Sequence, residues 1–439
     1  MEVNILCVGD MHIGRSISLP FVSELEENGI KLKDLQPGEA WSLACDKAIE
    51  QKADVVALLG DLVDRDDQFY EALGPLEQGI HRLVTAGIQV VGIAGNHDSQ
   101  VLPRLQKSIP SFKLIGAGGR WEVYNLDEFN LQFVGWSFPQ NAVTTNPMTT
   151  FHTVEDQLTP NTQTVIGLLH CELDVPKSAN APVYSPSLLN PNVSAWLLGH
   201  IHKPSIQSEQ FRPVGYLGSL SGLDPTETGA HGPWKLEIEN RTISMEHLPV
   251  APLRFEQMDI PVDNIHTIEE LQDAQESAIR KYASSLEDGL GDAKVISLRI
   301  KLTGRSDCHR ELRSASSGEL GVGTVRSISQ RMWGVEKVDI TDVRPNLVLK
   351  TDSEGKDPRT VLSRILEDLI EGKGDSVQLI EDAERELQSA ASKRGWSSES
   401  AKDIDFESTK NFLLRAAWTA LEELDAQFTG NDSKREAGA

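Results

Sequence analysis

Several features of membrane and secreted proteins are missing from this sequence. No apolar run approaches the roughly 18 residues that a membrane-spanning helix needs. The chain opens on Met1, Glu2 and Val3, without the basic region and apolar core of a signal peptide. There are only four cysteines, widely separated and without a CxxC pair, which favours reduced thiols. We therefore expect a cytoplasmic protein with no membrane partner.

An excess of positive charge is also missing. Lys and Arg total 42 against 66 Asp and Glu, for a net charge of −24, and the acidity is spread along the chain. Proteins that bind nucleic acid by charge alone carry a basic surface instead. A phosphate-bearing substrate would have to be held by something else, and bound metal ions are the obvious candidates.

A phosphate-binding loop for ATP is not found either. The glycine-rich segment 116–119 lacks the strand–GxxxxGK[ST]–helix context of a P-loop. We expect no ATP site in this chain, so any ATP in its biology would come from a partner.

The first half of the chain repeats one local pattern, a short apolar run followed by a polar loop. Five such runs occur, at residues 3–8, 53–59, 87–93, 164–169 and 193–198. Apolar and polar residues alternate little within these runs, which indicates strands buried on both faces. Between the runs we expect helices at about 38–51 and 68–86. Composition and strand spacing thus predict an α/β fold.

The loops after these runs carry a set of metal-binding residue types. The candidate ligands are Asp10, His12, Asp61, Asn96, His170, His200 and His202. Oxygen ligands mixed with imidazoles suit Mn²⁺, Fe²⁺ or Zn²⁺ better than Ca²⁺ or Mg²⁺ alone. Each residue taken singly could be surface polarity, a turn or a packed histidine. Five clusters in this order, each after a buried strand, favour a centre for two divalent cations at the carboxyl ends of the strands.

The sequence pattern changes near Pro249, where the second half begins. We expect an α+β domain at 253–350, with strands at 255–260, 295–302 and 335–343, a helix at 265–286 and a helical piece at 326–333. The sequence pattern predicts helices at residues 358–430, with a linker at 395–398. It predicts a disordered tail at residues 431–439. The helices could pack on the chain's own core or dock a partner.

The motifs of the first half resemble those of a known family. DxH at Asp10, GDxxDR at Asp61, GNHD at Asn96, the strand-end His170 and GHxH at His200 are similar to the calcineurin-like metallophosphoesterases. The segments 216–220 (YLGSL) and 227–229 (ETG) resemble the SbcD-type DNA repair exonucleases within that superfamily. The resemblance implies a four-layer α/β/β/α sandwich at residues 1–252, a smaller α+β capping domain and a helical C-terminal tail.

The resemblance also implies individual roles. One metal would be held by Asp10, His12 and His202, the other by Asn96, His170 and His200, and Asp61 would bridge the two ions. His97 would be the general acid, and Asp64 would orient His97. Arg65 would either clamp a substrate phosphate or simply solvate a loop. The break-repair nucleases of archaea and eukaryotes usually carry histidine where this chain has Asp64, which leaves the balance of exonuclease and endonuclease activity open.

We therefore expect a two-metal phosphodiester hydrolase, most simply a Mn²⁺-dependent DNA nuclease in DNA repair. The family resemblance implies an SbcC-like, SMC-type ATPase partner docked through the C-terminal helices, and a homodimer. The alternative is a phosphodiesterase or phosphatase acting on a small molecule or nucleotide. A protein Ser/Thr phosphatase fits less well, because this chain has GNHD in place of GNHE. A scaffold with an inactive site fits poorly with a complete ligand set.

Overall fold

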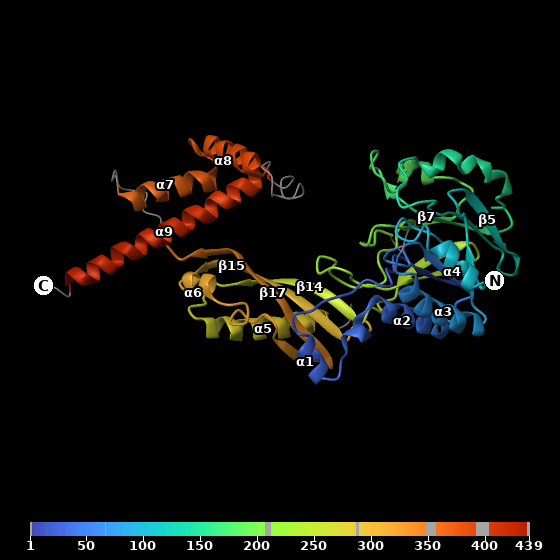
Figure 1. The fold of residues 1–439 in the computed structure, drawn as a ribbon, viewed down its shortest axis with the longest axis horizontal. Helices are drawn as coiled ribbons and strands as arrows, with labels where there is room; N and C mark the ends of the chain where they lie inside the picture. The colour runs from blue at the N-terminus through green and yellow to red at the C-terminus, as the bar shows by residue number, and fades with distance from the viewer. Residues whose placement is uncertain are drawn as a thin grey trace. The chain divides into compact units, whose positions relative to one another are not determined.

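The computed structural model describes residues 2–65, 67–206, 212–286, 289–347, 357–391 and 404–436. By compactness the chain divides into two units (Figure 1). The first contains residues 1–258, 279–299 and 321–337, and the second contains residues 259–278, 300–320 and 338–439. The domain boundaries that we expected from the sequence stay predictions.

The first unit contains a six-stranded sheet in the order β13-β12-β1-β2-β3-β4. Its strands are β1 (Glu2–Val8), β2 (Val55–Leu59), β3 (Gln89–Ile93), β4 (Phe112–Leu114), β12 (Trp234–Glu239) and β13 (Thr242–His247). Strands β1 to β4 are parallel, β12 extends the sheet antiparallel to β1, and β13 pairs antiparallel with β12. The parallel arrangement brings the loops after β1, β2 and β3 to one edge of the sheet.

A second sheet of five strands has the order β11-β10-β7-β6-β5. Its strands are β5 (Trp121–Leu126), β6 (Leu131–Trp136), β7 (Thr164–His170), β10 (Ala195–Gly199) and β11 (Val214–Tyr216). Strands β6, β7, β10 and β11 are parallel to one another. The carboxyl ends of β7 and β10 therefore also share an edge.

The two sheets pack face to face because alternate residues of each strand point to opposite sides. In β1, Val3, Ile5 and Cys7 join the core between the sheets, together with Leu168 of β7 and Leu197 of β10. A strand with both faces buried has no polar positions, which explains the continuous apolar runs in the sequence.

Helices cover the outer face of the first sheet. Leu6 and Val8 of β1 pack against α2 (Pro37–Glu50) and α3 (Phe69–Thr85), where Trp41 is the largest buried side chain. The two helices expected from the sequence are confirmed.

The outer face of the second sheet is covered by 3₁₀ segments and loops. Phe151 of η3 (Pro147–Thr153) and Leu188 of η5 (Ser185–Leu188) pack with Trp196 of β10. The α/β sandwich is confirmed, although 3₁₀ turns stand in its fourth layer where we expected α-helices. Short helices α1 (Val22–Glu27) and α4 (Leu102–Ser108), 3₁₀ turns η1 (Leu32–Leu35), η2 (Asp127–Phe129) and η4 (Glu155–Gln157), and the small β8 (Glu172–Leu173) and β9 (Pro182–Val183) complete the connections.

A four-stranded sheet follows, in the order β14-β15-β17-β16. Its elements are β14 (Leu253–Pro261), α5 (Ile268–Leu286), β15 (Val295–Ser306), α6 (His309–Ser314), β16 (Val325–Ile328) and β17 (Arg331–Pro345). The prediction of a helical piece at 326–333 was wrong, because these residues form the antiparallel β16–β17 hairpin. The turn residues Ser329 and Gln330 have φ values of 48° and 63°, as a two-residue hairpin turn requires.

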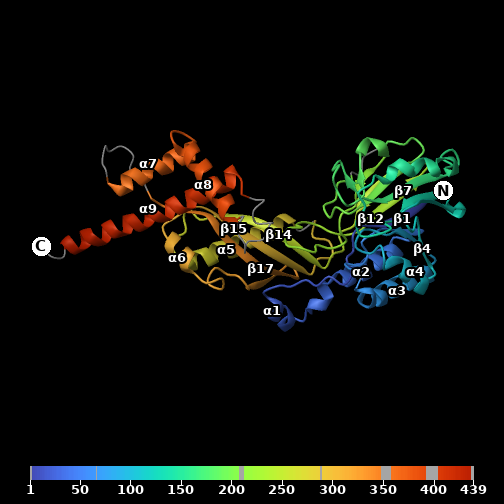
Figure 2. The same cartoon turned by 45° about the horizontal axis from the view of Figure 1, so that its top comes forward.

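Three helices end the chain: α7 (Pro358–Glu371), α8 (Ser376–Ala391) and α9 (Phe406–Glu436). Helices α7 and α8 lie beside α9 (Figures 1 and 2). Leu366 of α7 packs with Trp418 and Leu421 of α9 in a small core. Gly372, at φ 66°, ends α7 in the left-handed conformation. Within the described ranges, no helix is both long and apolar enough to cross a membrane.

Two details of the predicted tail differ from these helices. Helix α9 continues to Glu436, into the range 431–439 for which we expected disorder, and residues 437–439 lie outside the described residues. The predicted linker at 395–398 also lies outside the described residues.

Packing between α2 and α3 gives a stability prediction. Alanine favours a helix over glycine by about 1 kcal/mol, so Gly79→Ala in α3 should stabilise by propensity alone. A Cβ at Gly79, however, would lie 2.2 Å from Nε1 of the buried Trp41, which donates a hydrogen bond to the carbonyl of Pro75 at 3.1 Å. Overpacking costs about 1–3 kcal/mol, so we expect Gly79→Ala to lower the free energy of unfolding.

The matched control is Gly38→Ala at the start of α2, where a Cβ would meet only Pro75, at 3.9 Å. Thermal unfolding followed by circular dichroism should show a lower Tm for Gly79→Ala and an unchanged or higher Tm for Gly38→Ala. Equal Tm values for the two variants would show that the Trp41 contact is not tight.

Candidate metal centre

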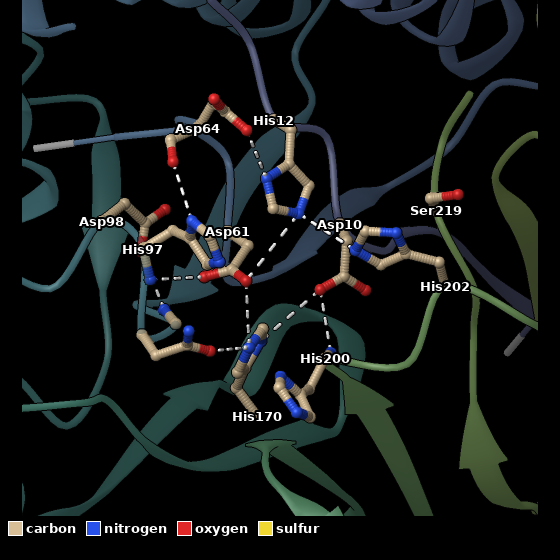
Figure 3. Close-up of polar contacts among 12 residues, drawn as sticks. Asp10, His12, Asp61, Asp64, His97, Asp98, His170, His200, His202 and Ser219 are labelled. Carbon is tan, nitrogen blue, oxygen red and sulfur yellow. Dashed lines mark hydrogen bonds and ion pairs between the residues drawn. The ribbon is translucent and has the colours of Figure 1, made fainter. Parts of the chain in front are cut away.

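The seven candidate ligands converge at the shared edge of the two facing sheets (Figure 3). They follow β1 (Asp10, His12), β2 (Asp61), β3 (Asn96), β7 (His170, its last residue) and β10 (His200, His202). The loops after β1 and β2 are joined directly, because the backbone N–H groups of Met11 and His12 both donate to the carbonyl of Asp61 at 2.9 Å.

Asp10, His12 and His202 form one group of potential ligands. The Nε2 atoms of His12 and His202 face each other at 3.1 Å. Nδ1 of His12 lies 3.2 Å from Oδ1 of Asp64, and Nδ1 of His202 lies 2.7 Å from Oε1 of Glu227. In the neutral tautomer that carries its proton on Nδ1, next to these carboxylates, each ring presents a lone pair at Nε2. Two lone pairs at this separation repel unless a cation lies between them.

Asp61, His170 and His200 form a second group. Nδ1 of His170 donates to the carbonyl of Leu59 at 2.9 Å, which leaves the lone pair of the neutral ring on Nε2. That Nε2 lies 3.3 Å from Oδ2 of Asp61 and 3.1 Å from Oδ1 of Asn96. When the ring is neutral, as a metal ligand must be, three acceptors meet at one point.

Asp61 lies between the two groups. Its Oδ2 is 3.3 Å from Nε2 of His170 and 3.8 Å from Nε2 of His12. Its Oδ1 accepts a hydrogen bond from the backbone N–H of His97 at 2.9 Å, which fixes the carboxylate plane. One carboxylate oxygen can thus serve both groups, although the assignment of single residues to single metals stays a prediction.

An unpaired buried oxygen tests whether cations fit this centre. Asp10 is fully buried, and its Oδ1 accepts from the backbone N–H of His200 at 2.8 Å. Its Oδ2 is buried and meets no hydrogen-bond partner among the described residues. Leaving a buried carboxylate oxygen unpaired is costly, and a cation removes that cost. The donors present, carboxylate and amide oxygens with imidazole nitrogens, fit two divalent ions such as Mn²⁺, Fe²⁺ or Zn²⁺.

The backbone is strained at three of the candidate ligands. His12, Asp61 and His200 have φ values of 48°, 50° and 101°, in a region that non-glycine residues rarely occupy. Each such residue costs on the order of 1–3 kcal/mol and persists only where the surroundings enforce it.

The glycines that precede two of the ligands are explained by the close approach of ligand side chains from neighbouring strands. A Cβ at Gly95 would lie 2.1 Å from Oδ1 of Asp61, and a Cβ at Gly199 would lie 2.7 Å from Nδ1 of His170. The glycines of the GNHD and GHxH motifs therefore leave room for the ligands of neighbouring strands.

The electrostatics of the centre reflect this crowding. For His170, burial opposes the charged ring, but the Asp61 carboxylate outweighs it and raises the pKa to about 9. For Asp61, burial raises the pKa, while His170 and His12 together lower it well below its usual value. Burial and the neighbouring His170 lower the pKa of His200 to about 4, so this ring is neutral near pH 7.

His97 lies at the edge of the centre and is exposed. Its Nδ1 donates to an oxygen of Asp64 at 2.8 Å, but that oxygen belongs to the backbone carbonyl (Figure 3). The carboxylate of Asp64 contacts Nδ1 of His12 instead, and the expected role of Asp64 in orienting His97 stays a prediction. Among the described residues no hydrogen-bond partner meets Nε2 of His97, which leaves this atom available to a substrate.

Arg65 lies beside the centre with its side chain 71% exposed and its Nε 3.6 Å from Oδ2 of Asp64. Arg15, which we had not singled out, lies on the same carboxylate, with Nη1 3.8 Å from Oδ1 of Asp64. Both guanidinium groups are near enough to the centre to meet an incoming anion.

Two carboxylates, those of the half-buried Glu227 and the buried Asp98, were missed as parts of the centre. Glu227 fixes His202 and is itself held by the backbone N–H of Leu223 at 3.0 Å and the hydroxyl of Ser219 at 3.3 Å. Its ETG segment was visible in the sequence, but only as a mark of resemblance. Asp98 accepts from the N–H groups of Leu62 at 2.6 Å and Gly95 at 2.8 Å. Burial and the nearby Asp61 charge raise the pKa of Asp98 to about 7.

Comparison with known proteins agrees with this geometry. Residues 3–204 match the family model of the calcineurin-like phosphoesterases, and residues 255–341 match the model of the middle domain of the metallophosphoesterase YhaO. An uncharacterized metallophosphoesterase, YhaO of Bacillus subtilis strain 168, is 24% identical over 255 residues, which cover 54% of this chain and 59% of the relative. The DNA double-strand break repair protein Mre11 of Aeropyrum pernix is 25% identical over 239 residues, or 52% of this chain and 56% of the relative. The match thus spans little more than half of each relative.

Among solved structures, a dimetal phosphatase from Danio rerio aligns over 56% of this chain and 95% of its own, with 12% identity and a TM-score of 0.38. A putative 5′-nucleotidase from Staphylococcus aureus aligns over 66% of this chain and 58% of its own, with 15% identity and a TM-score of 0.36. Likeness at this level carries no weight in the argument about function.

Residues 3–204, which contain both ligand groups, are similar to the calcineurin-like metallophosphoesterases, a class of metal-dependent phosphoesterases, and the two relatives agree with this similarity. Members of that class use two divalent metals, in agreement with the donors found here.

The contact between Glu227 and His202 gives a second prediction. Glu227→Ala removes the acceptor that holds Nδ1 of His202, so Nε2 is no longer fixed toward the centre. Loss of such a supporting carboxylate typically weakens metal affinity about 10–100-fold. Titration of the metal-free protein with Mn²⁺ in a calorimeter should show this loss for at least one ion.

Glu227→Gln, which keeps an acceptor oxygen, should recover part of the affinity, and Glu128→Ala on the surface should bind as the wild type does. Unchanged Mn²⁺ affinity in a folded Glu227→Ala protein would show that Glu227 has no part in the centre.

Proposed function

We propose that this protein is a two-metal-dependent DNA nuclease of the SbcD type that acts in DNA repair. The observation that carries the proposal is the pair of ligand groups that share Oδ2 of Asp61, with His97 available beside them. The relative named as a DNA double-strand break repair protein supports a DNA substrate. The middle-domain match to YhaO supports a chain with a capping domain but names no substrate.

The residues of the centre would divide the work of phosphodiester hydrolysis. When bound, two divalent cations supply Lewis-acid stabilisation of the phosphoryl oxygens and acidify water. Asp10, Asp61 and the histidine Nε2 atoms hold the positive charge in place. Protonated at Nε2, His97 would donate a proton to the departing sugar oxygen. The backbone carbonyl of Asp64 holds the ring of His97 by Nδ1, so the ring can present Nε2 without reorienting.

The exposed guanidinium of Arg65 would bind a non-bridging phosphate oxygen, with Arg15 beside it. Such local cations matter in a chain with a net charge of −24. We propose Mn²⁺ as the native metal, with Fe²⁺ or Zn²⁺ as alternatives. We keep a cytoplasmic location and a homodimer as proposals.

The C-terminal helices support the proposal of an SMC-type ATPase partner. Part of their apolar surface packs in the core around Leu366 and Trp418. On α7 and α8 other large apolar side chains remain exposed, namely Val361, Ile365, Ile370, Val377 and Leu379. The internal core leaves these side chains available, which supports the proposal that an amphipathic partner docks on them.

A phosphodiesterase or phosphatase acting on a small molecule remains the second candidate. The strong net negative charge favours it, because long-range repulsion opposes the approach of DNA.

Nuclease assays on linear duplex and single-stranded DNA with Mn²⁺, Mg²⁺ or EDTA test the proposal. Asp61→Ala should abolish Mn²⁺-dependent cleavage and also the rise in Tm that Mn²⁺ produces, because both ligand groups lose their shared oxygen. His97→Ala should lower kcat about 10²–10⁴-fold while the Mn²⁺-induced rise in Tm is kept, since His97 is not a ligand.

His152→Ala is the matched control, because His152 is an exposed histidine outside the centre. Intact DNA together with hydrolysis of bis(p-nitrophenyl) phosphate would overturn the nuclease and favour the small-molecule diester. Full activity of His97→Ala would remove His97 from the mechanism.

A further inference from the structure

A hollow of ≈ 650 Å³ lies in the second unit, and none of its lining residues belongs to the metal centre. It is an open groove lined by α6, β17 and α9. Its lining residues are His309, Arg313, Ile340, Thr341, Val343, Arg344, Phe412, Arg415, Ala416, Trp418, Thr419 and Ala420. The volume is in the range of sites for small ligands.

Contacts between α6 and α9 fix the walls of this groove. Nδ1 of His309 lies 2.8 Å from Oε2 of Glu422, and Nη1 of Arg313 donates to Oγ1 of Thr419 at 2.7 Å. Arg305 lies over the ring of the buried Trp418, 5.3 Å from its centroid. The groove is therefore built by side chains that are ordered against one another.

The charge of the groove is opposite to that of the whole chain. Three of its lining residues are arginines and none is acidic, in a protein with a net charge of −24. Arg344 directs Nη1 to the carbonyl of Thr341 at 2.7 Å, which holds its guanidinium in place. Among the described residues, the side chain of Arg415 meets no hydrogen-bond or ion-pair partner.

The acids nearest to the groove are already engaged. Asp342 forms an ion pair with Lys301 and lies only 4.0 Å from Nη2 of Arg344. Glu422 accepts from His309 and lies 3.8 Å from Nε of Arg310. Partial burial lowers the pKa of Arg344, the Asp342 carboxylate raises it, and the Arg415 guanidinium lowers it again. Arg344 and Arg415 therefore repel each other, and the Asp342 carboxylate that Arg344 meets is shared with Lys301.

An aromatic ring stands beside these cations. Phe412 lines the groove and is 48% exposed, which is unusual for a phenylalanine. Phe412, Arg415, Ala416 and Thr419 recur at intervals of three and four residues, so they lie on one face of α9. Their spacing places a flat apolar surface next to a guanidinium.

We propose that this groove binds a ligand that combines a phosphate group with a planar ring, that is, one nucleotide unit. Arg344 and Arg415 take the phosphate through charge-assisted hydrogen bonds, and Phe412 stacks on the base. The unit can come from a free nucleotide or from a nucleic-acid strand, since both present the same groups. The proposal does not depend on the activity of the metal centre.

The test uses the full chain in EDTA, where the metal centre cannot hydrolyse the probe. Fluorescence anisotropy of a labelled eight-residue oligo-dA measures binding, with unlabelled dAMP and inorganic pyrophosphate as competitors. We expect Arg344→Ala/Arg415→Ala to weaken binding at least about tenfold. Arg364→Ala/Arg385→Ala removes the same charge from α7 and α8 and should bind as the wild type does. Phe412→Ala should weaken binding of the oligonucleotide and of dAMP but leave that of pyrophosphate unchanged.

Competition by dAMP at concentrations near the oligonucleotide Kd would identify a free nucleotide as the source, and failure of dAMP to compete would identify a strand. No binding by the wild type, or equal affinity of the two double variants, would overturn the proposal. Arg344→Ala/Arg415→Ala should hydrolyse bis(p-nitrophenyl) phosphate with Mn²⁺ as fast as the wild type does. The binding assay thus tests the groove, and the hydrolysis assay separately tests the metal centre.

Discussion

Repulsion among buried acceptor groups is the constraint on which the rest of this structure depends. The Nε2 atoms of His12 and His202 face each other, and Nε2 of His170 faces two oxygens. Among the described residues, no hydrogen-bond partner meets the buried Oδ2 of Asp10. Without a divalent cation this arrangement must be offset by protons, as the raised pKa of His170 reflects, because buried lone pairs and carboxylates have lost their water. It becomes favourable when divalent ions occupy the points where these atoms meet.

The fold supports this centre by rigid elements around it. Parallel strands of two facing sheets end at one edge and deliver ligands from four loops and from the end of β7. Each histidine whose Nδ1 contact is described is held by an acceptor behind it: Asp64 for His12, Leu59 for His170 and Glu227 for His202. These contacts fix which nitrogen faces the centre, so the strained backbone at His12, Asp61 and His200 is maintained by packing and hydrogen bonds on all sides.

Much of this could be predicted from sequence because the determinants are local. Buried strands followed by Asp, Asn or His predicted both the α/β fold and the residues that converge. The β16–β17 hairpin was misread as a helix, since its two turn residues, Ser329 and Gln330, are not the Asn-Gly pair that usually marks such a turn. The contact of Glu227 with His202 depends on loop geometry. So does the arrangement in which the backbone carbonyl of Asp64, and not its carboxylate, contacts His97. The arginine groove depends on three elements far apart in the chain, so no local pattern could indicate it.

The number of metal ions bound per chain tests the central claim most directly. Calorimetric titration of the metal-free protein with Mn²⁺, checked by elemental analysis after gel filtration, measures it. The account predicts two ions per wild-type chain and a loss of tight binding of both in Asp61→Ala, because one oxygen of Asp61 serves both groups. A single ion in the wild type, or two ions retained by Asp61→Ala, would contradict it.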